Sequence, residues 1–167
     1  VANPSGYTSN GISTYVHPVS DEWNHLAFTY NATINLVEIF LNGESIGQTF
    51  STDDIPNTNG SMVMGSYATW QNSNPSPSYN DFTGVLDEVR ISDVVRYTSN
   101  FSIPDNDFTV DENTIALFHF NAGEGNILYD HSGNQNHGTI NGATWEENIY
   151  GCTDSLAGNF NPEANWD

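Results

Sequence analysis

Oxygen-bearing side chains recur at alternate positions in one short segment near the end of the chain. Asp130, Ser132, Asn134 and Asn136 carry carboxylate, hydroxyl or amide oxygens, and Gly133 between them permits a tight bend. Calcium is a hard cation that takes oxygen ligands. The segment therefore predicts a calcium-binding loop, although it lacks the bidentate acid that closes an EF-hand. The alternative is a loop held by its own side-chain hydrogen bonds.

Asp87 is a second candidate calcium ligand, because it lies in a run of alternating apolar residues. Alternation places it on one face of a strand with Val85 and Val89. A carboxylate in an apolar row is costly unless it is paired or bound to a metal. We expect either a calcium ligand near the end of this strand, or a carboxylate that accepts loop N–H groups or pairs with Arg90 or Arg96.

Three aromatic residues offer a different kind of site. Tyr67, Trp70 and Tyr79 lie in or beside the long polar segment 68–83. A flat indole or phenol ring can bury the apolar C–H face of a sugar. These residues therefore predict a ligand-binding surface for saccharides. The alternative is that the three rings anchor the segment onto the core.

Residue patterns typical of enzymes are missing from the sequence. There is no Gly-x-Ser-x-Gly nucleophile elbow, and the single cysteine, Cys152, lies outside the expected core. No two histidines have the helical spacing of a zinc site, so we expect all of them to be structural or solvent-facing. The sequence therefore predicts a protein without catalytic residues.

Short β-strands are the elements expected to position these residues. Apolar residues alternate with period two between turn-forming clusters, and no long segment has a helical period. The Asn42-Gly43 pair predicts a tight hairpin turn. Two packed antiparallel sheets are the architecture that such strands favour. The expected strands are 12–17, 24–30, 36–41, 44–50, 61–67, 84–91, 115–120 and 139–145.

The charge of the chain excludes two classes of partner. The 167 residues include 21 acidic and only 2 basic residues, for a formal net charge of −19. Nucleic-acid binding and docking on anionic lipid both need basic surfaces. No apolar run is long enough to span a bilayer, so we also expect no membrane insertion. The acidic surplus is either a solvated surface or, in part, a set of calcium ligands.

Four blocks of sequence resemble the concanavalin A-like, laminin-G-like domains (LamG type 3, related to pentraxins). The resemblance implies an all-β, two-sheet antiparallel jelly-roll sandwich over residues 1–149, with a calcium site near Asp87. In many members the fourth block opens the domain. Here the sandwich is therefore either permuted, with the fourth block pairing beside strand 84–91, or made of the back half of one domain and the start of another. The blocks are 22–30 (EWNHLAFTY), 37–43 (VEIFLNG), 84–91 (GVLDEVRI) and 117–139, which contains LFHF, EG and DHSGNQNHGT.

Residues 150–167 lack the alternating pattern and have a different character. They include Gly-Cys-Thr-Asp and are similar to a short Cys-bounded repeat of secreted marine Bacteroidota proteins. This resemblance implies a linker or the start of a small repeat. It also implies that Cys152 pairs with a cysteine beyond this segment, in an oxidising compartment.

The expected function is a non-catalytic, extracellular, calcium-stabilised recognition or adhesion module of a larger cell-surface or secreted protein. Its expected partners are a glycan or a surface protein, other domains of the same polypeptide, and a strand added from a neighbouring chain. The rival is a structural spacer, stalk or filament subunit without a ligand. Glycoside hydrolases of this sandwich carry Glu-x-Asp-x-x-Glu on one strand. Neither Glu38 nor Glu88 has that spacing.

Overall fold

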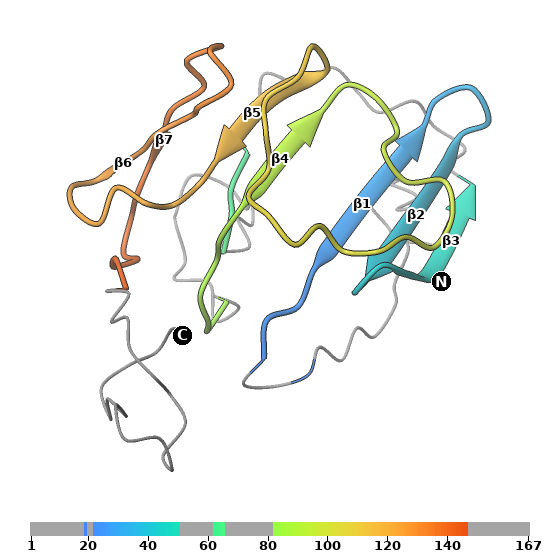
Figure 1. Ribbon diagram of the computed structural model, residues 1–167, viewed down its shortest axis with the longest axis horizontal. Coiled ribbons are helices and arrows are strands. Elements are labelled where there is room, and N and C mark those ends of the chain that lie inside the picture. The colour runs from blue at the N-terminus through green and yellow to red at the C-terminus, as the bar shows by residue number, and fades with distance from the viewer. Residues whose placement is uncertain (1–18, 20–21, 51–61, 66–81, 147–167) are drawn as a thin grey trace, which may run out of the picture. The chain divides into compact units, whose positions relative to one another are not determined.

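Strands and loops, with no helix, make up residues 19, 22–50, 62–65 and 82–146, the part of the chain that the computed structural model describes (Figure 1). The all-β expectation is confirmed for these residues, which also contain no helix that could cross a membrane. The described residues form three sheets, in the orders β1–β2–β3, β4–β5 and β6–β7. The two-sheet jelly-roll sandwich stays a prediction. The strands are β1 (Leu26–Asn31), β2 (Leu36–Leu41), β3 (Glu44–Phe50), β4 (Val89–Ser92), β5 (Thr114–Phe118), β6 (Ile127–Leu128) and β7 (Gly138–Thr139).

The chain divides into two compact units, and each has buried residues of its own. The first unit comprises the described residues within Val1–Val63 and Ile91–Ile115; the second comprises those within Met64–Arg90 and Ala116–Asp167. The core residues of the first unit are Ile39 and Phe40, and those of the second are Ala116, Leu117, Phe118 and Leu128.

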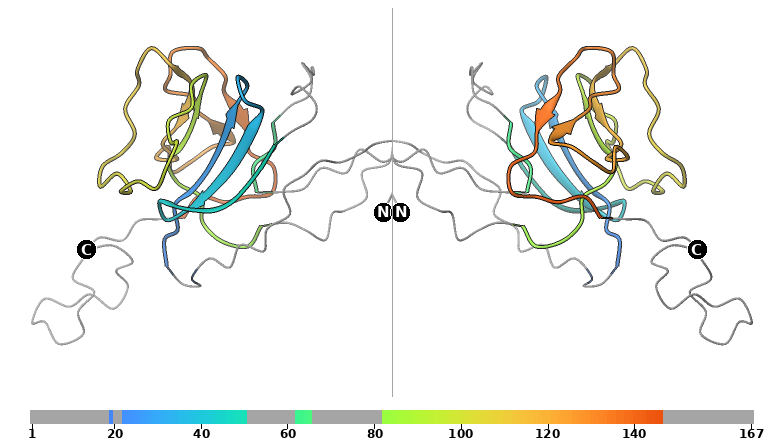
Figure 2. Two further views of the ribbon diagram at one scale, coloured as in Figure 1. Left: turned by 90° about the vertical axis from the view of Figure 1, so that its right-hand side faces the viewer. Right: turned by 90° about the vertical axis from the view of Figure 1, so that its left-hand side faces the viewer.

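A three-stranded antiparallel sheet forms the first unit's regular structure. β1 pairs with β2 along its full length, from Leu26 opposite Leu41 to Asn31 opposite Leu36. β2 and β3 follow from the alternating pattern with the bounds that the sequence predicts. The Asn42-Gly43 turn between them is also confirmed, because φ is 51° at Asn42 and 80° at Gly43. Figure 2 shows these strands side by side from two further directions.

Aromatic rings cover one face of this sheet. Phe40, which is fully buried, meets the rings of Tyr97 and Phe101 edge-on, at centroid distances of 6.2 and 5.5 Å. Tyr97 and Phe101 stack on each other at 3.6 Å, and His25 meets Phe101 edge-on at 5.5 Å. Edge-to-face and stacked pairs add to the free energy gained from burial alone. The loop that follows β4 is therefore fixed to the sheet by ring contacts.

The β2–β3 turn supplies a second attachment for that loop. The N–H of Phe101 donates to the carbonyl oxygen of Gly43 at 2.9 Å, and the N–H of Ser45 donates to Oδ1 of Asn100 at 3.0 Å. The approach is so close that a Cβ atom at Gly43 would lie 2.1 Å from the carbonyl oxygen of Phe101. Gly43 is thus required both by its positive φ and by its neighbour.

The second unit is built around β6, β7 and the end of β5. Ile127 and Leu128 of β6 pair antiparallel with Thr139 and Gly138 of β7. Leu117 of β5 is fully buried, and its carbonyl oxygen accepts a 2.7 Å hydrogen bond from the N–H of His131. The loop between β6 and β7 is therefore tied directly to β5. β5 also pairs with β4, and the permuted arrangement of the sandwich stays a prediction.

The strand expected over 84–91 is shorter in the structure. β4 begins only at Val89, because Glu88 has a φ of 49°, which interrupts an extended backbone. Asp87 precedes this break and is exposed. Its carboxylate is therefore not buried in an apolar row, contrary to the expectation from the sequence. The expected strand at 139–145 is reduced to β7. Of the expected strand 61–67, residues 62–65 are described and do not form a strand. The expected strand 12–17 lies outside the described residues.

Replacing Gly43 by alanine tests the close approach of the turn to Phe101. Gly142 is a matched control, since its φ of 82° nearly equals that of Gly43 but a Cβ atom there would have nothing within 4 Å. We expect Gly142→Ala to lower the free energy of unfolding by about 1 kcal/mol, the cost of a left-handed φ. Gly43→Ala should cost at least about 2 kcal/mol more in denaturant unfolding, because the added atom also overlaps backbone. Equal losses would contradict the close contact.

Candidate functional site

Asp130 lies at the centre of a hydrogen-bond network in the loop between β6 and β7. Its Oδ1 accepts from the N–H groups of Leu117 at 2.9 Å and Ser132 at 2.8 Å. Its Oδ2 accepts from the hydroxyl of Ser132 at 2.8 Å and from the N–H of Asn136 at 2.9 Å. One carboxylate therefore joins β5 to both ends of the loop.

The electrostatic state of Asp130 follows from these contacts. The residue is only 7% exposed. Burial acts to raise the pKa of its carboxyl, and the backbone hydrogen bonds from Leu117, Ser132 and Asn136 outweigh burial and hold the pKa at about 2. Asp130 is thus ionised throughout the physiological range, with its charge stabilised by N–H and O–H dipoles.

The loop residues predicted as calcium ligands are brought together, but as partners of one another. A carboxylate has about four lone-pair sites, and four donors occupy those of Asp130. The hydroxyl of Ser132 also accepts from the N–H of Asn134 at 3.2 Å. This donor-filled arrangement does not fit a cation at Asp130. No group of three or more His, Cys, Asp or Glu side chains suited to a metal occurs in the described ranges. Calcium stays a prediction of the sequence.

Asp87, the other predicted ligand, lies in the segment before β4. It is exposed, and its Oδ1 accepts a 2.9 Å hydrogen bond from the N–H of Glu88. Arg96, one of the partners considered for it, instead forms two hydrogen bonds with Asp111, of 2.8 and 2.7 Å. These bonds raise the pKa of Arg96 and lower the pKa of Asp111.

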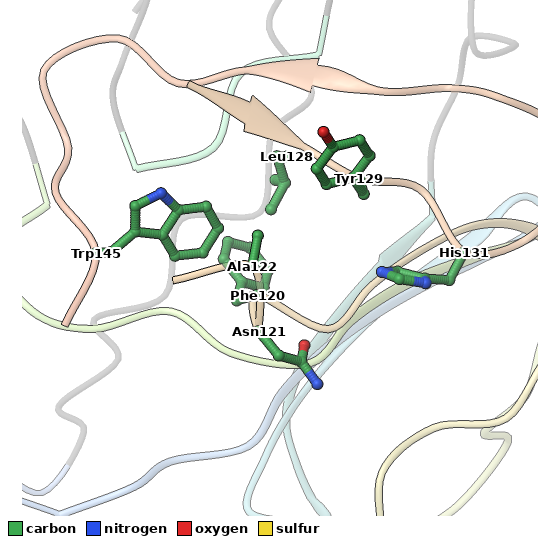
Figure 3. A pocket seen from close by; sticks show the side chains of 7 residues that line it. All are labelled: Phe120, Asn121, Ala122, Leu128, Tyr129, His131 and Trp145. Atoms are coloured by element: carbon green, nitrogen blue, oxygen red, sulfur yellow. The ribbon is translucent and has the colours of Figure 1, made fainter. Parts of the chain in front are cut away.

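An open pocket of about 390 Å³ lies in the second unit (Figure 3). Figure 3 shows the indole of Trp145 and the imidazole of His131 at opposite ends of this space. Ligand pockets have volumes of this order and combine apolar walls with a few polar groups. The lining residues are Phe120, Asn121, Ala122, Leu128, Tyr129, His131 and Trp145.

Contacts behind the pocket fix the orientation of its walls. The indole N–H of Trp145 donates to the carbonyl oxygen of Gly125 at 2.9 Å. The ring of Tyr129 meets that of His137 edge-on at 5.6 Å, and Nδ1 of His137 accepts from the N–H of Asp130 at 3.0 Å. The aromatic walls are therefore held in place without a ligand, which lowers the entropy lost on binding.

A histidine–carboxylate pair stands next to one wall of the pocket. His119 Nδ1 and Glu88 Oε1 are 2.7 Å apart, and the rings of His119 and His131 are 4.9 Å apart. Two residues here have unusual backbones, since φ is 49° at Glu88 and 56° at Phe120. Bulky residues adopt this region only when the surrounding structure imposes it, and such strain is often found at functional sites.

Sequence reasoning missed this pocket. Its aromatic residues are scattered over Phe120–Trp145 and have no periodic pattern. The sequence predicts a structural or solvent-facing His131 rather than a pocket residue. The one signal that could have pointed to the pocket is the adjacency of Tyr129 and His131 to Asp130. The predicted ligand-binding residues Tyr67, Trp70 and Tyr79 lie outside the described residues and stay a prediction.

The pH dependence of stability tests the role of Asp130. Its pKa falls from an ordinary value of 3.8 to about 2 on folding. Its contribution is therefore present above about pH 4 and is lost as the pH falls toward 2. We expect Asp130→Asn to lower the free energy of unfolding by about 2 kcal/mol at pH 7, and this difference should shrink below pH 4. Asp105→Asn, which removes a charge from an exposed loop residue, should change stability little. A deficit that persists undiminished at pH 2.5 would contradict the assignment.

Comparison with known families gives one match. Residues 2–100 match the laminin G 3 family, which is described as the concanavalin A-like lectin/glucanases superfamily. Neither the curated proteins nor the solved structures contain a match to this chain. The matched segment ends before the first residue of the pocket, so the family match and the pocket geometry are independent observations. On the match over residues 2–100, the chain belongs to the laminin G 3 family of the concanavalin A-like lectin/glucanases superfamily.

Proposed function

We propose that this chain is a non-catalytic, extracellular recognition module that binds glycans through the pocket of its second unit. The observation that carries the proposal is the lining of that pocket, where fixed aromatic rings lie beside an amide and an imidazole. Membership of a superfamily described by its lectins and glucanases supports a lectin-like or adhesion-type role in general terms.

The chemistry of the lining suits a sugar ring. The ring faces of Trp145 and Tyr129 can cover the apolar C–H face of a pyranose. The side-chain amide of Asn121 and the imidazole of His131 offer donors and acceptors for its hydroxyl groups. An open site with few polar groups binds through contact area and hydrogen bonds, as recognition requires.

The same lining supports a binding role over a hydrolytic one. Glycoside hydrolysis uses two carboxyl groups that flank the scissile bond. Among the described residues that line the pocket, none is Asp or Glu. Glu88 points its carboxylate to His119, with Oε1 and Nδ1 2.7 Å apart. The pocket therefore offers surfaces for holding a saccharide without an acid and base placed to cleave it.

Glycan binding and its dependence on Trp145 test the proposal. We expect the 167-residue chain to bind a subset of glycans on an array, and Trp145→Ala to weaken binding roughly tenfold through loss of ring stacking. Trp23→Ala is the matched control, because Trp23 lies in the first unit and is 59% exposed. Trp70→Ala, measured in parallel, tests the surface that the sequence predicts.

The outcomes separate the alternatives. If Trp70→Ala removes binding and Trp145→Ala does not, the saccharide site is the one predicted from residues 67–79. If no glycan binds, the proposal is wrong, and a protein ligand or the structural role of a spacer or filament subunit takes its place.

Calcium stabilisation is tested by thermal unfolding with calcium and with a chelator. The sequence predicts that calcium raises the melting temperature and that Asp130→Ala removes the rise. The filled hydrogen bonds of Asp130 give the opposite expectation, since a cation could bind there only after displacing donors such as the N–H of Asn136. Superimposable curves at millimolar calcium would leave Asp130 with its hydrogen-bonding role alone. A calcium-dependent rise in the wild type only would establish the metal site.

A further inference from the structure

We propose that the pocket of the second unit selects uncharged saccharides and rejects anionic ones such as uronic acids and sulfated sugars. This inference rests on the proposed glycan-binding function and specifies the class of ligand. The charge preference follows from two features of the pocket: carboxylates lie near it, and no Lys or Arg is among its lining residues.

The walls of the pocket carry no permanent charge. Their polar side-chain groups are the amide of Asn121, the phenol of Tyr129 and the imidazole of His131, since the indole N–H of Trp145 donates to the carbonyl oxygen of Gly125. Proteins usually bind the carboxylate or sulfate of an anionic sugar with Arg or Lys, whose donors match those groups. Here only His131 can carry a positive charge.

The remainder of the chain offers few positively charged side chains that could bind an anionic sugar. The full sequence contains no lysine and only two arginines, Arg90 and Arg96. Neither arginine lines the pocket, and Arg96 is bound to Asp111 in the first unit through two hydrogen bonds. Because the residues outside the described ranges include no Lys or Arg, no such side chain of theirs can complete an anion site.

Negative charge lies close to the walls. Asp130, which is ionised at neutral pH, comes between Tyr129 and His131 in the chain. Glu88 contacts His119, and the ring of His119 is 4.9 Å from that of His131, so this carboxylate is one side chain removed from the pocket wall. The chain as a whole carries a formal charge of −19. An anionic sugar would meet repulsion both at the pocket and on approach.

His131 is therefore the residue that determines the charge preference. As a neutral ring it can donate to one sugar hydroxyl and accept from another. It is exposed and lies at the end of the pocket opposite Trp145 (Figure 3), so a longer cationic side chain at this position would reach the same space. His131→Arg should supply the missing positive charge, whereas His131→Gln keeps the position neutral and polar.

Matched sugar pairs test the proposal. Oligosaccharides of glucose, galactose and mannose are each compared with the oligomer of the corresponding uronic acid, in which a carboxylate replaces the C6 hydroxymethyl group. Binding is followed at about pH 7.5, in about 20 and about 300 mM salt, through the NMR signal of the Trp145 indole N–H, assigned with Trp145→Phe. We expect at least one neutral oligomer to bind and its uronic acid counterpart to bind at least roughly tenfold more weakly at low salt.

Salt and the two His131 variants complete the experiment. The gap between neutral and anionic sugars should narrow at the higher salt concentration, since salt screens exposed charges. His131→Arg should reduce the gap at least roughly threefold, and His131→Gln should leave it unchanged. Trp23→Ala should behave as the wild type.

Each outcome decides between the two proposals. A uronic acid that binds as tightly as its neutral partner overturns the charge preference and leaves glycan binding intact. Binding that shifts other signals but not the Trp145 indole, and that survives Trp145→Ala, overturns this pocket as the site. Failure of all the sugars, neutral and anionic, overturns the glycan-binding function itself.

Discussion

The second unit depends on one buried negative charge that hydrogen-bond donors stabilise. Four donors converge on the carboxylate of Asp130, three of them backbone N–H groups from β5 and the β6–β7 loop. Hydrogen bonds to an ionised acceptor are stronger than neutral ones, and a buried charge left without them is costly. The loop therefore has little freedom to open locally while Leu117 stays buried. Asp130 acts as a link between a strand and a long connection, alongside the hydrogen bond from the N–H of His131 to the carbonyl oxygen of Leu117.

The position of Asp130 in the chain explains why the pocket walls are ordered. Tyr129 and His131 are its immediate neighbours, so the bonds that hold the carboxylate also hold the backbone of both side chains. The N–H of Asp130 donates to His137, which in turn packs against Tyr129. Two walls of the pocket are thus placed by the same network. The first unit achieves order differently, through stacked and edge-on aromatic rings around Phe40.

Local patterns predict local structure well in this chain. The alternation in 36–41 and 44–50 and the Asn42-Gly43 turn predict β2, β3 and their hairpin correctly, because period and turn chemistry act over a few residues. The alternation in 84–91 is misleading, because the left-handed backbone at Glu88 is not encoded in apolar spacing. The oxygen-rich loop at Asp130 can be located from its residues. The same side-chain oxygens can either coordinate a metal or accept hydrogen bonds from N–H groups, so the sequence alone does not decide between these two roles. The pocket forms only because side chains from residues 120–145 meet in space, and no periodic pattern in the sequence predicts that arrangement.

Charge acts on this protein at two distances. At long range, a chain with 21 acidic and 2 basic residues repels anions whatever its fold. At short range, the carboxylates near the pocket have partners within the protein: Asp130 accepts from donors of β5 and of its own loop, and Glu88 contacts His119. The walls are left with aromatic faces and neutral polar groups. The repulsion of anions and the uncharged walls then both favour a neutral ligand. The carboxylates of Asp130 and Glu88 already have partners within the protein, so a neutral ligand does not have to remove water from them.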